Sequence, residues 1–201
     1  MISIIMSAYN AGQTIKKSLD SCLNQTYKDI EIIVVNDCST DDTMEVVESI
    51  NDSRIRLINK EVNGGAGLAR RTGIQSIKGD YTIFLDSDDY FDDATILEKL
   101  LDVAIKEDAD IVSPGYKIVD TKFNIIETRQ SSYAVLTGDD KFKPDVADTR
   151  RFMNPMLLKA HLWDKVTYNG RRFIEDTPTL VPILWNANKV VTVPYSAYNY
   201  I

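Results

Sequence analysis

The sequence is poor in cysteine, histidine and positive charge. Its 201 residues include two cysteines, Cys22 and Cys38, in no CxxC arrangement, and His161 is the single histidine. These scarcities argue against a disulfide scaffold and a Cys/His zinc site, so we interpret the cysteines as reduced thiols and His161 as structural. The net charge of −7 disfavours a nucleic-acid-binding protein, because such proteins usually present a basic face.

Membrane-spanning and targeting segments are missing as well. No apolar run approaches the roughly 20 residues that a membrane-spanning helix needs. The apolar start, Met1–Ile5, is too short for a signal peptide and lacks its basic flank. We therefore expect a soluble, cytoplasmic chain. The sequence stops at Ile201 without a terminating signal, so we expect further residues after it, which leaves room for a peripheral contact with the inner face of the membrane.

The composition that remains is that of an ordinary globular domain, with 44% hydrophobic and 26% charged residues. Over residues 1–113, short apolar runs alternate with segments of helical periodicity. Strands are predicted at residues 2–8, 30–35, 54–58, 81–85 and 110–113, with helices between them. This alternation predicts an α/β fold with a mostly parallel sheet and helices on both faces.

The pattern loosens after Pro114. Further strands, of antiparallel type, are predicted at residues 116–119, 125–128 and 131–136. Helices are predicted at residues 154–162 and 176–186, and a last strand at 190–193. No internal repeat and no low-complexity linker separates the two halves.

Polar residues follow the predicted parallel strands at Asn10, at Asp37 and at the cluster Asp86–Asp89. Ligands of open α/β sheets bind at the carboxyl ends of the strands. The cluster Asp86-Ser87-Asp88-Asp89 holds adjacent carboxylates that repel one another unless a cation compensates. Such oxygen ligands suit Mg²⁺ or Mn²⁺ shared with substrate phosphates, although a solvated acidic turn is the plainer alternative.

Other readings of the acidic cluster fail on spacing. A calcium-binding EF-hand loop that began at Asp86 would need glycine at its sixth position and glutamate at its twelfth, where Phe91 and Leu97 stand. A phosphatase-like Asp-x-Asp-x-Thr motif would need threonine at position 90, which is Tyr90.

The glycine-rich segment Asn63–Gly67 is not a dinucleotide-binding fingerprint. It lacks the third glycine and follows the third predicted strand instead of the first. It still presents backbone N–H groups at a helix start, followed by Arg70 and Arg71, which could contact a phosphate. For Arg71 a solvated position is an equally good interpretation.

Two polar segments of the second half say little by themselves. Glu175-Asp176 precedes an apolar helix, where negative charge is favoured by the helix dipole. Trp163 and Lys165 are, on residue type alone, a packing and a surface residue.

Taken in order, these segments resemble the inverting family-two glycosyltransferases, which have a GT-A fold. Ile4–Asn10 looks like the opening strand followed by Pro-x-Tyr-Asn, and Val34–Asp41 is similar to Val-x-Asp-Gly-Ser-x-Asp. Asn63–Gly73 matches Asn-x-Gly-x-x-x-Ala-Arg-Asn-x-Gly, and Phe84–Asp89 matches the Asp-x-Asp segment. The resemblance is weaker after residue 115.

The resemblance implies a role for each matching residue on the donor side. Tyr9 and Asp37 would line the pocket for the nucleotide base, and Arg70 would contact the base or the diphosphate. Asp86 would lie near the ribose and the metal, and Asp88 would be the direct ligand of Mn²⁺ or Mg²⁺. An acidic protein would then bind an anionic donor because the cation bridges them.

On the acceptor side, Asp176 matches the family's catalytic base, and Trp163, Lys165 and Glu175 match neighbouring conserved segments. The implied reaction is a single displacement, in which Asp176 takes a proton from the acceptor hydroxyl. Residues 1–113 would form the nucleotide-sugar-binding half, and residues 114–201 the half that carries the acceptor site and the base. The partners implied are a nucleotide-diphosphate sugar, most simply a UDP-sugar, and a glycan or glycolipid acceptor in polysaccharide assembly.

The sequence departs from the family pattern at Ser7, Cys38 and Arg71, where the family has Pro, Gly and Asn. None of these changes removes a catalytic group. A nucleotidyltransferase is the alternative enzyme, but it would carry a basic glycine-rich loop after the first strand, and Tyr9–Gln13 has no basic residue. A non-catalytic nucleotide-sugar- or carbohydrate-binding module is the other alternative; retention of Asp88 and Asp176 speaks against it.

Overall fold

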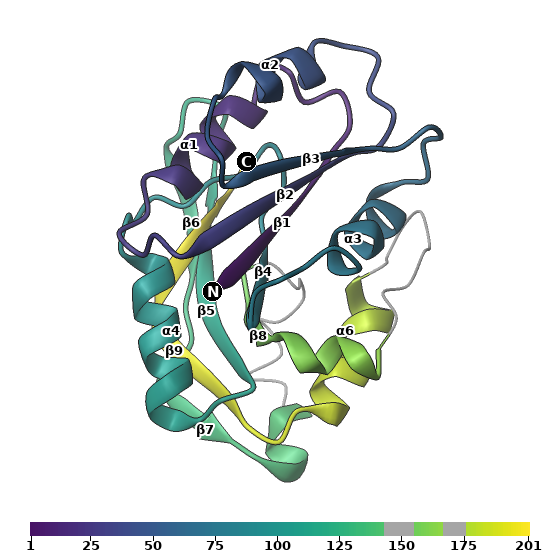
Figure 1. Cartoon of the computed structure of the whole chain (residues 1–201). Coiled ribbons are helices and arrows are strands. Elements are labelled where there is room, and N and C mark those ends of the chain that lie inside the picture. The colour runs from purple at the N-terminus through teal and green to yellow at the C-terminus, as the bar shows by residue number, and fades with distance from the viewer. Residues whose placement is uncertain (143–154, 167–175) are drawn as a thin grey trace.

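The computed structural model describes residues 1–142, 155–166 and 176–201. Within these ranges the strands form one mixed sheet in the order β3-β2-β1-β4-β8-β5-β9-β7, with β6 paired to β5 (Figure 1). The strands are β1 Ile2–Ala8, β2 Ile30–Asn36, β3 Ile55–Asn59, β4 Tyr81–Phe84, β5 Ile111–Val119, β6 Ile125–Arg129, β7 Ala134–Leu136, β8 Leu157–Lys159 and β9 Val190–Tyr200.

The first half of the sheet is parallel, as the sequence predicts. β1 lies between β2 and β4, with Ile4 opposite Ile32 on one side and Ile83 on the other, and β3 pairs with the outer side of β2. β2 is buried along its whole length, and β1 nearly so. Strands covered on both faces need apolar side chains in both directions, which is why these segments read as continuous apolar runs.

Helices cover both faces of the sheet. They are α1 Ile15–Leu23, α2 Thr43–Ser49, α3 Ala66–Ile74, α4 Ile96–Glu107 and α6 Asp176–Asn186, with short 3-10 helices η1 Gly138–Phe142 and η2 Ala160–Asp164. α1, α2 and α4 lie on one side of the sheet and α3 and α6 on the other (Figure 1). Along β1, Ile4 and Met6 join the core under α1 and α4, whereas Ile5 joins the opposite core. Of the helices that the structure describes, none combines the length and apolar character needed to cross a bilayer.

The second half of the sheet is mixed. β8 pairs antiparallel with both β4 and β5, β6 pairs antiparallel with β5, and β9 runs parallel to β5. The segment at 131–136 contributes only β7, and the strand expected at 190–193 continues to Tyr200.

The structure corrects two expectations for this half, namely the strand break at Pro114 and the helix at residues 154–162. The strand does not break at Pro114: β5 passes through it, because the register against β9 shifts between Ser113 and Tyr116. A bulge of this kind is where a strand tolerates proline. Gly115 is needed there as well, since a Cβ on it would lie 1.9 Å from the carbonyl oxygen of Arg129. β5 spans Ile111–Val119 and so passes through residue 113; the division of roles predicted at that residue stays a prediction.

The helix predicted at residues 154–162 is wrong over the described residues. Leu157–Lys159 forms the strand β8, and only the 3-10 helix Ala160–Asp164 follows. Leu157 and Leu158 are fully buried between β4 and β5. A short apolar run is compatible with either a buried strand or a buried helix turn. Here the segment forms a strand because it pairs with the edges of both β4 and β5.

Candidate active site

One cavity of about 420 Å³ opens at the carboxyl ends of β1, β2 and β4. The donor-side residues predicted from the sequence all line it: Tyr9, Asp37, Arg70, Asp86 and Asp88. They come from three loops and one helix, and parallel strands that end at the same edge bring them together.

The turn after β1 forms one wall of the cavity. Tyr9 is half exposed there, and Asn10 adopts a left-handed backbone conformation with φ of +51°. The side-chain oxygen of Asn10 accepts a hydrogen bond from the backbone amide of Thr40 at 2.8 Å. The backbone amide of Asn10 donates to Ser39 Oγ at 3.0 Å. Asparagine is among the few residues that tolerate this conformation, so Asn10 joins the turn beside Tyr9 to the loop after β2.

Asp37 fastens the glycine loop to the end of β2. Its buried carboxylate accepts hydrogen bonds from the amides of Gly64, at 3.0 Å, and Gly65, at 2.6 Å, and pairs with Lys60. Gly65 has φ of +85°, which glycine adopts without steric penalty. Asp37 therefore has a structural role in holding the glycine loop. Its contact with the nucleotide base stays a prediction.

Lys60 is a residue that the sequence reading missed. It follows β3, and β3 and β2 are parallel neighbours, so Lys60 and Asp37 emerge at the same edge of the sheet. The sequence did contain a signal for this ion pair. A basic residue comes just after one predicted strand, and an acidic residue comes just after the neighbouring one.

Cys38, beside Asp37, takes a strained backbone conformation. Its φ is +63°, in the left-handed region that favours glycine, and glycine is the residue the family pattern has here. Its thiol contacts the carbonyl oxygen of Glu61 at 3.5 Å. The loop keeps its shape with cysteine, at the cost of that strain.

Arg70 reaches the cavity from α3. The side chain is almost fully buried, and its Nη2 lies 2.6 Å from Asp86 Oδ1. Its guanidinium carbon also lies 6.0 Å from the centre of the Phe84 ring. Arg71, by contrast, is exposed, which agrees with a solvated position for it.

The acidic cluster divides its carboxylates between the cavity and the protein interior. Asp86 and Asp88 line the cavity, whereas Asp89 is 1% exposed and accepts hydrogen bonds from the Tyr198 hydroxyl and from the Ile201 amide at 3.0 Å. Burial and the charge of Asp86 raise the pKa of Asp88. Burial raises the pKa of Asp89 to about 7, although the hydrogen bond from Tyr198 opposes the shift.

The described residues contain no group of three or more Asp, Glu, His or Cys side chains arranged to hold a metal ion. The cavity offers two carboxylates, Asp86 and Asp88, of which Asp86 already pairs with Arg70. Mg²⁺-type sites commonly use one or two carboxylates and complete their shell with water and substrate phosphates. The donor set therefore fits a cation that arrives with a diphosphate, and does not resemble a closed structural metal site.

The acceptor-side residues are placed less completely. Trp163 is buried, donates its indole N–H to Thr82 Oγ1 at 2.9 Å and packs edge-on against Phe84, so its described contacts are those of the core. Lys165 is exposed. Asp176 is the first residue of α6, and Glu175 lies outside the described residues. Their predicted roles stay predictions.

A parallel α/β half-sheet with an acidic loop and a buried arginine at its carboxyl edge is the arrangement expected of a GT-A fold. The sequence profile of "Glycosyl transferase family 2" matches residues 3–169, and the chain belongs to that family. The resemblance drawn from the motifs is thereby confirmed.

Individual relatives agree with this assignment. The glycosyltransferase GlyG of Streptococcus pneumoniae is 31% identical over 219 residues, which cover 100% of this chain and 70% of GlyG. Escherichia coli WfaP, a UDP-Glc:alpha-D-GlcNAc-diphosphoundecaprenol beta-1,3-glucosyltransferase, is 48% identical over 91 residues, which cover 45% of this chain and 36% of WfaP.

Solved structures confirm the fold. The crystal structure of S. aureus TarS 1–349 superposes with a TM-score of 0.84 at 21% identity, and covers 99% of this chain and 60% of that one. TarS has also been solved with UDP and with UDP-GlcNAc. The chain thus spans 70% of GlyG, 36% of WfaP and 60% of TarS 1–349.

Proposed function

We propose that this chain binds a UDP-sugar and transfers the sugar to an acceptor hydroxyl with inversion, assisted by a divalent cation. The observation that carries the proposal is the joint presence of Arg70, Asp86 and Asp88 in one cavity at the carboxyl edge of the sheet. The arginine can bind the negative phosphates of a nucleotide sugar, and the carboxylates can bind the cation that accompanies those phosphates. The UDP complexes of TarS and the UDP-Glc in the name of WfaP support uridine as the nucleoside.

The donor would lie along the cavity with its base near Tyr9 and Asp37 and its diphosphate near Arg70. The exposed Tyr9 ring offers a face on which a base can stack. Arg70 is held by Asp86, so its guanidinium is already oriented when the phosphates arrive. Such preorganisation removes the entropy loss that a mobile arginine would incur on binding.

The cation would be held by Asp88, with Asp86 beside it. When bound, Mn²⁺ or Mg²⁺ would neutralise the charge that develops on the departing diphosphate. The raised pKa of Asp88 supports this role, because a carboxylate crowded by burial and by Asp86 gains from a nearby positive charge. Arg70, which pairs with Asp86, would supply a second positive charge for the diphosphate.

The proton of the acceptor hydroxyl would pass to Asp176. This residue begins α6, on a segment far in sequence from the acidic loop. A base separate from the cation keeps its basicity, which a directly coordinated carboxylate loses. Trp163, Lys165 and Glu175 would serve the acceptor side around it.

The acceptor would be a glycan or glycolipid in the assembly of a surface polysaccharide. The diphosphoundecaprenol in the name of WfaP supports a lipid-linked acceptor. The chain would then act at the inner face of the membrane. Peripheral membrane association and this location are part of the proposal.

Calorimetry with UDP tests the donor site directly. We expect UDP to bind in the presence of Mn²⁺ and much more weakly when EDTA removes it. A panel of UDP-sugars should then identify the one that releases UDP when an acceptor is supplied. Absence of any UDP binding, with and without Mn²⁺, would refute the proposal.

A further inference from the structure

The last described strand reaches across the molecule to the acidic loop. Tyr90, directly after Asp89, forms an antiparallel bridge with Asn199 of β9. The Tyr90 amide donates to the Asn199 carbonyl at 3.3 Å, and the Asn199 amide returns a bond of 2.9 Å to the Tyr90 carbonyl. The end of β9 thus acts as a short pairing partner for the loop that follows β4.

The neighbouring residue on β9, Tyr198, contacts both ends of the acidic cluster. Its ring is 2% exposed, and its hydroxyl donates to Asp89 Oδ2 and lies 3.4 Å from the Asp86 amide, which donates to it. The other oxygen of Asp89 accepts from the Ile201 amide. One hydroxyl therefore links the first and last residues of the four-residue cluster, with Asp88 between them.

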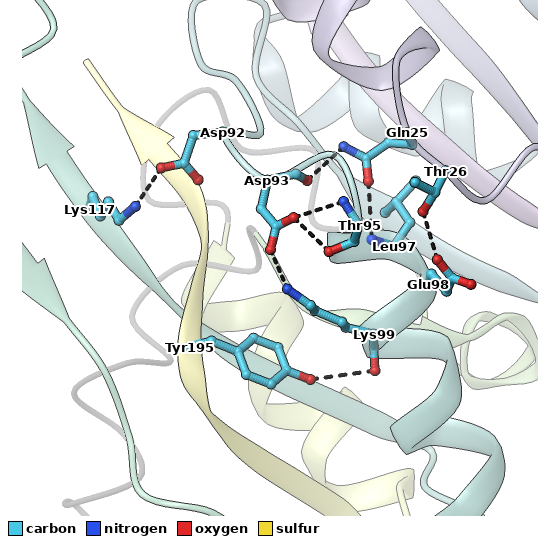
Figure 2. Close-up of polar contacts among 10 residues, drawn as sticks. All are labelled: Gln25, Thr26, Asp92, Asp93, Thr95, Leu97, Glu98, Lys99, Lys117 and Tyr195. Carbon is cyan, nitrogen blue, oxygen red and sulfur yellow. Dashed lines mark hydrogen bonds and ion pairs between the residues drawn. The ribbon is translucent and has the colours of Figure 1, made fainter.

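The segment after Tyr90 is fixed by a separate set of contacts (Figure 2). Asp92 pairs with Lys117 of β5. Just before α4, Asp93 accepts hydrogen bonds from the amide and hydroxyl of Thr95 and pairs with Lys99. The Gln25 side chain bonds to the Asp93 carbonyl at 3.0 Å and accepts from the Leu97 amide. Loss of the Tyr198 hydroxyl would leave these contacts intact, so its effect should be confined to the acidic cluster.

We infer that Tyr198 is a positioning residue of the donor site, which sets the orientation of Asp86 and Asp88 by holding Asp89 inward. This inference rests on the proposed function. Asp88 lies in a tight turn, in which the Asp89 amide donates to the Asp86 carbonyl at 3.1 Å. With both ends of that turn pinned by one hydroxyl, Asp86 and Asp88 remain directed to the cavity. Outer partners of metal ligands commonly change affinity about 10- to 100-fold when removed.

The matched pair Tyr198→Phe and Tyr195→Phe tests the inference. Each removes one hydroxyl from β9, but the Tyr195 hydroxyl contacts the Lys99 carbonyl at 3.4 Å, away from the cluster (Figure 2). We expect Tyr198→Phe to weaken UDP binding about 10-fold or more with Mn²⁺ present, with little effect on binding in EDTA. Tyr195→Phe should bind as the unaltered protein does. The rate of sugar transfer should also fall in Tyr198→Phe, and this loss of rate should diminish as the Mn²⁺ concentration is raised.

A ligand-free measurement separates this inference from the proposed function. Hydrogen exchange of the amides of residues 86–90 should be faster in Tyr198→Phe than in Tyr195→Phe without any nucleotide. Equal exchange in both variants, or equal loss of UDP affinity in both, would overturn the positioning role. If the unaltered protein bound no UDP at all, the proposed function would fail, and the exchange rates would still decide whether Tyr198 orders the cluster.

Asp89→Leu removes the acceptor of the same hydrogen bond and serves if Tyr198→Phe does not fold. The change should accelerate exchange over residues 86–90 as well. Because both changes remove the hydrogen bond between Tyr198 and Asp89, the loss of UDP affinity in the double variant should be smaller than the sum of the two single losses. Additive losses would show that Tyr198 and Asp89 act independently, against the inference.

Discussion

Arg70 Nη2 lies 2.6 Å from Asp86 Oδ1, and this ion pair joins helix α3 to the loop after β4 in the wall of the cavity. The two residues are 16 positions apart in sequence and belong to different elements, a helix and a loop. The pair orients the arginine and offsets one of the clustered negative charges. Asp88 also lines the cavity, and the proposed cation site rests on it.

Asp88→Asn should abolish Mn²⁺-dependent binding of UDP and leave the fold intact. Asp88 lines the cavity from a loop, so its removal disturbs no core contact. Calorimetry with and without Mn²⁺ checks this. Unchanged metal-dependent binding in the variant would show that Asp88 is not the ligand.

Asp37→Ala should weaken UDP binding by about 1–3 kcal/mol, which is the usual cost of leaving a buried donor or acceptor without its hydrogen bond. The change also releases Lys60 and the amides of Gly64 and Gly65. Lys60→Met is the matched control, because it removes the ion pair and keeps the Asp37 carboxylate. If the control loses as much affinity as Asp37→Ala, Asp37 acts through the loop and not through the base.

Asp176→Asn should slow sugar transfer by about 10²- to 10⁴-fold, as loss of a general base does. Affinity for UDP should stay nearly constant, because the donor site lies on other segments. Parallel kinetics on Glu175→Gln identify the base between the two neighbours. Loss of turnover in the Glu175 variant alone would transfer the role to that residue.

Cys38→Gly should stabilise the protein by up to about 1 kcal/mol. Relief of the left-handed backbone strain contributes roughly 1–2 kcal/mol, and the greater freedom of glycine in the unfolded chain offsets part of it. Cys38→Ala is the control, since it retains the strain and should give no gain. Urea unfolding of the three proteins measures the difference.

Asp93→Asn should destabilise the protein near neutral pH, and the difference should disappear in acid. Burial opposes ionisation of Asp93, but hydrogen bonds from Lys99 and Thr95 outweigh it and hold its pKa at about 2, against a usual 3.8. A folded-state pKa below the unfolded one stabilises the protein above the unfolded value and is lost as pH falls toward the folded value. Urea midpoints should therefore differ at pH 6 and converge between about pH 4 and 2. A constant difference would assign the effect to packing.

Prediction from the sequence succeeded where local pattern and tertiary environment agree. The segments Ile2–Ala8 and Ile30–Asn36 are apolar in both directions because helices cover both faces of the sheet. The residues predicted for the donor side line one cavity for a similar reason, since parallel strands end at a common edge. The helix expected at 154–162 failed because pairing with β4 and β5 outweighs local preference there.

The sequence alone determined the family, the parallel half of the sheet and the residues that meet in the donor cavity, because motifs and periodicity are properties of neighbouring residues. Only the tertiary structure decided which carboxylates of the acidic cluster face that cavity. Asp89 points inward because Tyr198, 109 residues later, and the Ile201 amide bind it there. Likewise Asp37 gains Lys60 only through the pairing of β2 with β3. Contacts between distant segments depend on strand order, which no local pattern encodes.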